Sequence, residues 1–303
     1  MAEVENQPRK GRSPTQLAVR RLKKNRLAMV GLAAVSVVVI LGLFPGLLAP
    51  HDYAQQYRDN DSWQVPPIYW PGFSGESNPS HPLGTDELGR DVLSRLIYGA
   101  GISLRVGVVG TAVAVLIGVL FGAIAGYFAG LTDWTISRLT DTFFAFPSLL
   151  LAIGILAVFE EPNETIIFAA LGLVGWPGVA RIVRGQVISL RNSEYVLAAQ
   201  ALGQKNSAIL IRHILPNCMG PIVVVATLMI AGNILAEAGL SFLGIGLPPP
   251  SPSWGRMLVD SKEFWPTMPW MGVLPGLAIS FTVLGFNLFG DGLRDAFDPK
   301  MRA

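Results

Sequence analysis

Six stretches of this chain are long and apolar enough to cross a lipid bilayer, and they constrain its fold more than any other feature. A hydrocarbon core about 30 Å thick needs roughly 20 apolar residues in a helix. Hydrophobic residues make up 51% of the 303 residues and charged residues only 15%, so lipid rather than water is the main solvent of this chain. The predicted spans are 27–49, 102–129, 142–159, 165–183, 219–246 and 271–290.

The apolar runs have the pattern of helices rather than of strands. Within a bilayer, only α-helices and closed β-barrels satisfy every backbone hydrogen bond. The strands of a barrel alternate between apolar and polar residues, whereas these runs are continuous and almost uncharged. We therefore predict an all-α polytopic membrane protein with six transmembrane helices. An even number of crossings places both termini on the same side.

The first apolar run, 27–49, follows a basic segment, 1–26, as the core of a signal peptide would. A cleavable signal has an apolar region of only about 7 to 15 residues, and this run is longer. We predict that it is retained as a transmembrane helix.

Basic residues in the connections indicate the orientation, because Lys and Arg are retained on the cytoplasmic side. With the amino terminus inside, the segment 1–26 and the tail 291–303 are cytoplasmic, and only six of the 23 basic residues lie outside. These six are Arg58, Arg90, Arg95, Arg105, Arg256 and Lys262. The three between 90 and 105 fit the rule least well, although acidic residues lie beside them.

The connection 50–101 is predicted to be an extracytoplasmic loop. It includes the sequence HPLGTDELGRDVLSRLIYGA, in which Thr85 or Asp86 is suited to cap a short helix. The apolar side of that helix would hold Leu88, Val92, Leu93, Leu96 and Ile97. We predict a short interfacial helix at the outer membrane surface that leads into the second span.

The connection 184–217 is predicted to be a cytoplasmic loop with a helix of its own. Good helix formers fill the stretch from Glu194 to Leu202, and Gly203 is placed to end it in a left-handed conformation. The small residues Ala198 and Ala199 would let another backbone approach closely, as when a helix lies in the groove of a partner. The alternative is a solvated linker helix with ordinary alanines.

This loop resembles the coupling loop of the permease subunits of ATP-binding cassette importers. The motif of that family is Glu, Ala, Ala, three residues, Gly, nine residues, Ile, one residue, Leu, Pro. The matching positions are Ala198, Ala199, Gly203, Leu215 and Pro216. Leu197 stands in place of the glutamate and His213 in place of the isoleucine, so Glu194, one turn earlier, is the candidate for the acidic role.

Further segments resemble the peptide and nickel branch of the same family, in its second permease subunit. They are HPLGTDELGRDVLSRLIYGAGISL, LSFLGIGLPPPSPSWGRML and PGLAISFTVLGFNLFGDGLRDAFDP, and the resemblance runs from about Leu17 to Pro299. It implies a type I importer fold with a permease core at 102–290. It also implies a related second permease in a heterodimer, two ATPase subunits, an extracytoplasmic substrate-binding protein, and a place in the bacterial cytoplasmic membrane. The implied cargo is a dipeptide or oligopeptide, with nickel, glutathione-like compounds and antimicrobial peptides as alternatives.

The sequence gives no indication of nucleotide, metal or nucleic-acid binding. It lacks the Gly, four residues, Gly, Lys, Ser or Thr pattern that holds phosphates, so we predict that ATP and Mg²⁺ are used by the partner ATPases and that this chain binds no cofactor. A net charge of +2 does not suit a nucleic-acid binder. The three histidines and the single cysteine have no metal-ligand spacing. We also predict no catalytic residue, because the serines of the spans have no histidine partner there.

Glu237 is the one ionisable residue that falls well inside a predicted span. A charged carboxylate at the membrane centre costs about 2.5 to 3.5 kcal/mol on insertion scales, so Glu237 is a candidate pathway or gate residue. The alternative is a structural hydrogen bond near the outer surface. A secondary transporter or channel would normally need several ionisable groups at mid-membrane, which favours an ATP-driven permease.

Overall fold

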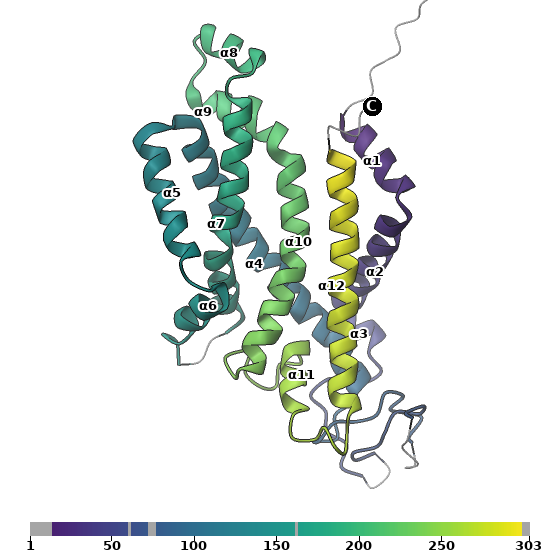
Figure 1. The fold of residues 1–303 in the computed structure, drawn as a ribbon. Coiled ribbons are helices and arrows are strands. Elements are labelled where there is room, and N and C mark those ends of the chain that lie inside the picture. The colour runs from purple at the N-terminus through teal and green to yellow at the C-terminus, as the bar shows by residue number, and fades with distance from the viewer. Residues whose placement is uncertain (1–13, 60–61, 72–76, 161–162, 299–303) are drawn as a thin grey trace, which may run out of the picture.

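A computed structural model describes residues 14–59, 62–71, 77–160 and 163–298, and the regular secondary structure of this part of the chain is helical apart from two isolated β-bridges. The helices form an elongated bundle (Figure 1). In chain order they are α1 (Pro14–Lys24), α2 (Arg26–Leu43), α3 (Pro45–Leu48), α4 (Val92–Phe128), α5 (Gly130–Phe144), α6 (Ser148–Leu156), α7 (Glu164–Leu190), α8 (Glu194–Ala201), α9 (Asn206–Ile209), the π-helix η1 (Leu210–Ile214), α10 (Leu215–Phe242), α11 (Trp254–Asp260) and α12 (Trp270–Phe297).

Five helical stretches of the described chain are long and apolar enough to span a membrane, and the bent pair of α5 and α6 raises this number to six. The five are α2, α4, α7, the run from α9 to α10, and α12. Figure 1 shows that α4 ends near α8 and that α7 begins at the opposite end of the bundle, so the pair between them crosses from one end to the other. The predicted all-α polytopic fold is confirmed.

The third predicted span, 142–159, is wrong as a single straight helix. The chain is already helical from Gly130, and α5 and α6 meet at an angle of 87°. Pro147 explains the break, because proline disfavours helical geometry in the residue before it and cannot donate a backbone hydrogen bond. The low hydropathy of 130–141 hides the first half of this span from a search for apolar runs.

The start of the second span and the separate interfacial helix were also predicted wrongly. The helix α4 begins at Val92, ten residues before the predicted 102, and runs without interruption to Phe128. Its N-cap is Asp91, whose Oδ2 accepts a hydrogen bond of 2.7 Å from the amide of Ser94. Neither Thr85 nor Asp86 starts a helix, because both lie in the loop before it.

Other helix ends differ by smaller amounts. The first span, predicted as 27–49, ends at Leu43 and is followed by the short helix α3. The fifth begins at Leu215 and ends at Phe242, compared with the predicted 219–246. The last continues to Phe297, so most of the predicted tail 291–303 is part of α12. Residues 1–13 of the predicted basic segment and 299–303 of the tail lie outside the described residues.

Glycines bring α4 and α7 into close contact. A Cβ atom added to Gly118 would lie 2.5 Å from the Cβ of Val179, and one added to Gly126 would lie 2.8 Å from the carbonyl oxygen of Arg184. A Cβ atom on Gly122 would overlap the carbonyl oxygen of Ala180. Small residues at such spacings let helix backbones approach one another in a membrane. These contacts fix α7, and with it the base of α8, against the longest helix of the bundle.

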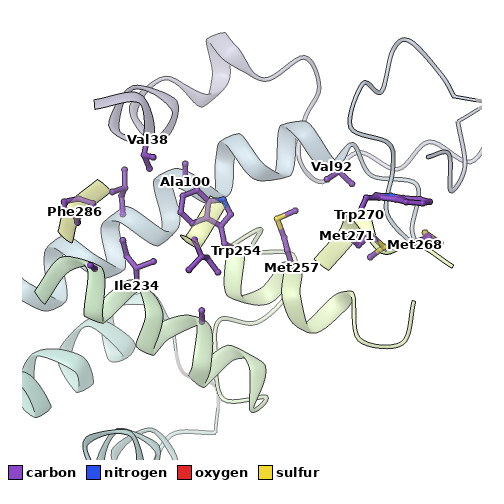
Figure 2. Packing of buried hydrophobic residues seen from close by; sticks show 14 residues of the cluster. Val38, Val92, Ala100, Ile234, Trp254, Met257, Met268, Trp270, Met271 and Phe286 are labelled. Atoms are coloured by element: carbon purple, nitrogen blue, oxygen red, sulfur yellow. The ribbon is translucent and has the colours of Figure 1, made fainter. Parts of the chain in front are cut away.

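A second packed region lies at the end of the bundle that holds α11. Figure 2 shows Trp254 between Ala100 of α4 and Ile234 of α10, with Met257 beside it. Trp270 is almost fully buried, and its Nε1 donates a hydrogen bond of 3.1 Å to the carbonyl oxygen of Thr85. This core joins α2, α4, α10, α11 and α12 to the long loop before α4.

Candidate functional site

The helix α8 projects beyond the ends of the other helices, at the end of the bundle where α1 begins and α12 finishes (Figure 1). It runs from Glu194 to Ala201, between the long helix α7 and the short helix α9. The sequence predicted Glu194–Leu202, so its position is correct and its length differs by one residue. The predicted turn and return towards the bundle follow as α9 and η1.

A left-handed glycine ends α8. Gly203 has a φ angle of +74°, which favours glycine because other residues are strained there. Its amide donates to the carbonyl oxygen of Gln200 at 2.9 Å, and the amide of Gln204 donates to that of Ala199 at 3.2 Å. This pair of hydrogen bonds is a Schellman motif. The chain therefore reverses sharply after α8.

The two sides of α8 differ in burial. Val196 and Ala199 are buried against Ile209 and the end of α7, in one apolar cluster. Ala198 faces outward, so the two adjacent alanines serve different sides of the helix. The exposed side also carries Leu197, which is 50% exposed, and the next residue after the helix, Leu202, is 81% exposed. Large exposed apolar groups of this kind mark contact surfaces in proteins.

A continuous helical run connects the α8 loop to the bundle. The elements α9, η1 and α10 follow one another without a break from Asn206 to Phe242. Leu215 and Pro216 begin α10 directly after the π-helix η1. His213 departs from the family motif, and its Nε2 lies 3.0 Å from Oε1 of Gln204. The loop is thus joined to α10 by one uninterrupted helical run.

Two hydrogen bonds attach this loop to the end of α4. Arg191 donates from Nη1 to the carbonyl oxygen of Gly126 at 3.2 Å. Tyr127 donates from its hydroxyl to Oδ1 of Asn206 at 3.0 Å. The loop therefore contacts three long helices, α4, α7 and α10.

Glu237 lies near the other end of the bundle, one to two turns before α10 ends. Its Oε1 accepts hydrogen bonds from the hydroxyls of Ser241 at 2.8 Å and Ser253 at 3.0 Å. Ser253 caps α11, because its hydroxyl oxygen accepts from the amide of Arg256 at 3.1 Å. Oε2 of Glu237 is buried and has no hydrogen-bond partner in the described part of the chain. The carboxylate thus joins α10 to the start of α11.

The arginines that fit the orientation rule least well are paired with acids. Arg90 donates from Nε to Oδ2 of Asp86 at 2.6 Å, and Arg95 from Nη2 to Oδ2 of Asp260 at 3.3 Å. Both arginines are buried. Arg105, in turn, pairs with Glu164 at 3.2 Å. Neighbouring carboxylates therefore compensate these positive charges.

Glu87 belongs to the same buried cluster, where its Oε1 accepts a hydrogen bond of 2.9 Å from Arg90. Burial, with a smaller contribution from Asp86, raises the pKa of Glu87 from 4.5 to about 6. Arg90 opposes this change without cancelling it. The cluster therefore contains a carboxyl group whose pKa lies well above the ordinary value of a glutamate.

The fold brings together two histidines that are far apart in the sequence. His51, His81 and Asp91 offer ligand atoms within 4.8 Å of one another. Nδ1 of His81 lies 3.0 Å from Oδ1 of Asp91, and Tyr57 places its hydroxyl 2.9 Å from Nδ1 of His51. The hydrogen bond of His81 joins the loop to Asp91, the N-cap of α4, and that of Tyr57 lies within the loop. Only the folded loop reveals them, because 30 residues separate the two histidines.

Two segments of the chain match known protein families. Residues 118–303 match the family described as the inner membrane component of binding-protein-dependent transport systems. Residues 13–67 match the N-terminal transmembrane domain of oligopeptide transport permease C.

Individual relatives are similar to the chain over nearly its full length. The chain is 44% identical to a dipeptide transport system permease protein DppC of Alkalihalophilus pseudofirmus, over 96% of this chain and 91% of the relative. It is 42% identical to an oligopeptide transport system permease protein OppC of Bacillus subtilis, over 94% and 89%. It is 37% identical to a glutathione transport system permease protein GsiD of Pectobacterium atrosepticum, over 96% and 93%.

The fold is also similar to a solved structure, the methionine ABC transporter MetNI in inward-facing conformations. The TM-score is 0.53 at 18% identity, over 67% of this chain and 96% of that one. The similarity concerns the fold alone. The chain belongs to the multi-pass inner-membrane permease components of binding-protein-dependent ATP-binding cassette transporters, which work with an ATPase and a substrate-binding protein.

Proposed function

We propose that this chain is the permease subunit of an importer of dipeptides or oligopeptides, and that α8 is the helix through which a partner ATPase moves it. Relatives that are 42 to 44% identical over nearly the whole chain are named for dipeptide and oligopeptide transport. The match to the N-terminal domain of oligopeptide permease C supports the same branch.

The observation that carries the coupling proposal is the exposed apolar side of α8. Leu202 and Leu197 are 81% and 50% exposed, and α8 lies beyond the ends of the long helices (Figure 1). A helix that presents small and apolar residues in this way fits into a groove of a partner. Ala198 and the backbone at Gly203 leave room for that partner, and Glu194 is exposed in the first turn.

The α8 end of the bundle then faces the cytoplasm, where ATP is available. Each of two ATPase subunits would bind one such helix, one on this chain and one on a related second permease. ATP and Mg²⁺ would be held by the ATPases. Closure of the ATPases would pull α8, and the uninterrupted run into α10 would pass the movement to the transmembrane helices.

Glu237 supports this motion as an anchor at the opposite end. Its hydrogen bonds to Ser241 and Ser253 join α10 to α11, so the outer half of α10 moves together with the outer loop. A direct pathway or gate role for Glu237 is the alternative, and Glu237→Gln distinguishes the two.

The cargo can be tested by uptake into vesicles that contain the complete transporter with its binding protein. A labelled dialanine, glutathione and Ni²⁺ would be offered separately, with and without ATP inside. We expect ATP-dependent accumulation of the dipeptide, reduced by an excess of unlabelled peptide. Accumulation of glutathione or nickel alone would refute the peptide assignment while leaving the permease fold intact. The glutathione arm is needed because a relative at 37% identity is named for it.

A further inference from the structure

Charged side chains lie on an exposed side of α5 and α7. Nη2 of Arg181 lies 3.2 Å from Oδ1 of Asp141, and Nη1 of Arg138 lies 3.4 Å from Oδ2 of the same carboxylate. The side chain of Arg181 is 58% exposed, that of Arg138 65% and that of Asp141 48%. We call these three residues the charged face. Arg181 also lies over the ring of Phe144, 4.2 Å from its centroid.

The charged face lies at membrane depth. The helix α7 has 27 residues and is about 40 Å long, roughly 10 Å more than a hydrocarbon core. Arg181 is about 13 Å from the end of α7 at Leu190, so it lies within the core even if all the excess length projects at that end. Asp141 is about 16 Å along α5 from Gly130. Its short side chain cannot extend to the membrane surface as an arginine can.

Ionised groups at this depth face water or protein rather than lipid, because transfer into hydrocarbon is unfavourable. The helix break on the same side gives an independent indication. The pair α5 and α6 bends by 87° around Phe146 and Pro147, and α6 starts without a side-chain cap. Irregular backbone inside a membrane is tolerated only where it is buried in protein or lines a water-filled cavity.

A polar pocket adjoins the charged face. It has a volume of about 240 Å³ between α4, α5 and α7. Ser137, Thr140, Asp141, Arg181 and Arg184 contribute to its lining. Because one water molecule occupies about 30 Å³ in the liquid, this space is large enough for several. Hydroxyls and charges in the wall would hydrogen-bond to them.

The outer side of α2 provides the contrast. Its exposed residues include Val30, Val37 and Ile40, of which Val37 is about 16 Å along the helix from Arg26, and Ser36 directs its hydroxyl to the carbonyl oxygen of Leu32 at 2.7 Å. This surface has the composition expected of contact with lipid. The outer side of α2 is therefore apolar, whereas the surface of α5 and α7 carries the charged face among exposed apolar residues such as Phe144 and Ile182.

We propose that the charged face lines the water-filled translocation pathway and binds the free carboxylate of a passing peptide. This rests on the proposed function above. Two arginines flank one aspartate, which leaves a net charge of +1 and two guanidinium groups able to receive an anion. Asp141 orients both guanidinium groups and competes for them, so the peptide is held only briefly.

Thiol labelling of the complete reconstituted transporter tests where the face lies. Thr142, exposed one turn after Arg138 on α5, is replaced in the variant Thr142→Cys, with Val37→Cys on α2 as the matched control. The native Cys218 is buried, so it contributes little background. A water-soluble charged methanethiosulfonate should label Thr142→Cys and leave Val37→Cys unlabelled. The anionic reagent should react faster than the cationic one, and Arg138→Gln should reduce that preference.

The contrary results are distinct. If Thr142→Cys resists the water-soluble reagent but reacts with an apolar maleimide, the face contacts lipid and the inference is wrong. If it reacts with neither in the complex but with both in the separated subunit, the face is a protein interface and the inference is also wrong. Either result, obtained in vesicles that still take up dipeptide, leaves the proposed function standing.

A kinetic comparison tests the ligand. Uptake of labelled dialanine is measured against uptake of its C-terminal amide in Arg181→Gln and Arg181→Lys, with Arg58→Gln of the outer loop as control. We expect the KM for dialanine to rise severalfold in Arg181→Gln, with partial rescue in Arg181→Lys and little change for the amide. Equal losses for both compounds would show that Arg181 has a structural role and binds no carboxylate.

Discussion

The amide of Gln204 donates a hydrogen bond of 3.2 Å to the carbonyl oxygen of Ala199, and this contact closes the end of α8. It requires the left-handed conformation of Gly203, with φ at +74°. In Gly203→Ala, that conformation costs about 1 kcal/mol or more, so the end of α8 should open. Hydrogen exchange of the amides from Gly203 to Lys205 should become faster. Gly185→Ala, at an open helical position of α7, is the control, and unchanged exchange in Gly203→Ala would contradict this account.

Glu237 holds two serine hydroxyls with one carboxylate oxygen. The variant Glu237→Gln keeps a carbonyl acceptor of the same shape, so a pure anchor predicts nearly normal stability and uptake. In Glu237→Ala both hydroxyls lose their acceptor, which should cost about 1 to 3 kcal/mol of stability. Thermal unfolding of the purified complex and dipeptide uptake measure the two properties. Loss of uptake in a stable Glu237→Gln complex would instead establish a pathway or gate role.

The pKa of Glu87, raised from 4.5 to about 6 by burial, makes the stability of the outer loop depend on pH. Because the folded state favours the protonated carboxyl, this contribution is fully present below pH 4.5 and is lost as the pH rises through about 6. Glu87→Gln, which stays neutral, should match the wild type at low pH and be more stable above pH 6. The difference would be seen in the unfolding midpoints of the wild type and Glu87→Gln, measured between pH 4 and 7. Glu263→Gln, at an exposed position, is the control. Parallel curves for wild type and Glu87→Gln would refute the assignment.

The packing of α4 on α7 depends on Gly122, where a Cβ atom would meet the carbonyl oxygen of Ala180. Gly122→Ala should therefore lower stability by about 1 to 3 kcal/mol through overpacking. Gly154→Ala is the matched control, because no atom lies within 4 Å of the added Cβ in α6. Thermal aggregation followed by size-exclusion chromatography would measure both. Equal stability of the two variants would contradict this prediction, because α4 and α7 would then move apart to make room for a methyl group without loss of stability.

The features that the sequence predicted correctly are local ones. Helix formers between Glu194 and Ala201, followed by Gly203, specify α8 and its end through contacts between neighbours in the chain. Long apolar runs similarly identify most of the spans, because the bilayer selects them by length and polarity.

The features that it missed depend on contacts between distant residues. The bend at Pro147 and the polar helix before it do not register in a count of apolar residues, although the proline itself was a usable signal. The pairing of Arg95 with Asp260 joins residues 165 positions apart. Asp91, the true cap of α4, was the acid closest to the apolar helix, and its preference for that position could have identified it.

Movement of α8 by a partner ATPase is the central claim, and Leu202→Asp tests it most directly. Leu202 is 81% exposed, so the substitution should leave the fold intact while placing a charge on the contact surface. Ser207→Asp, exposed on α9, is the control. ATP-dependent uptake of labelled dialanine would be measured together with copurification of the ATPase. We expect both to fall in Leu202→Asp and to persist in Ser207→Asp. Full uptake with the ATPase still bound in Leu202→Asp would contradict the claim and make α8 a simple linker.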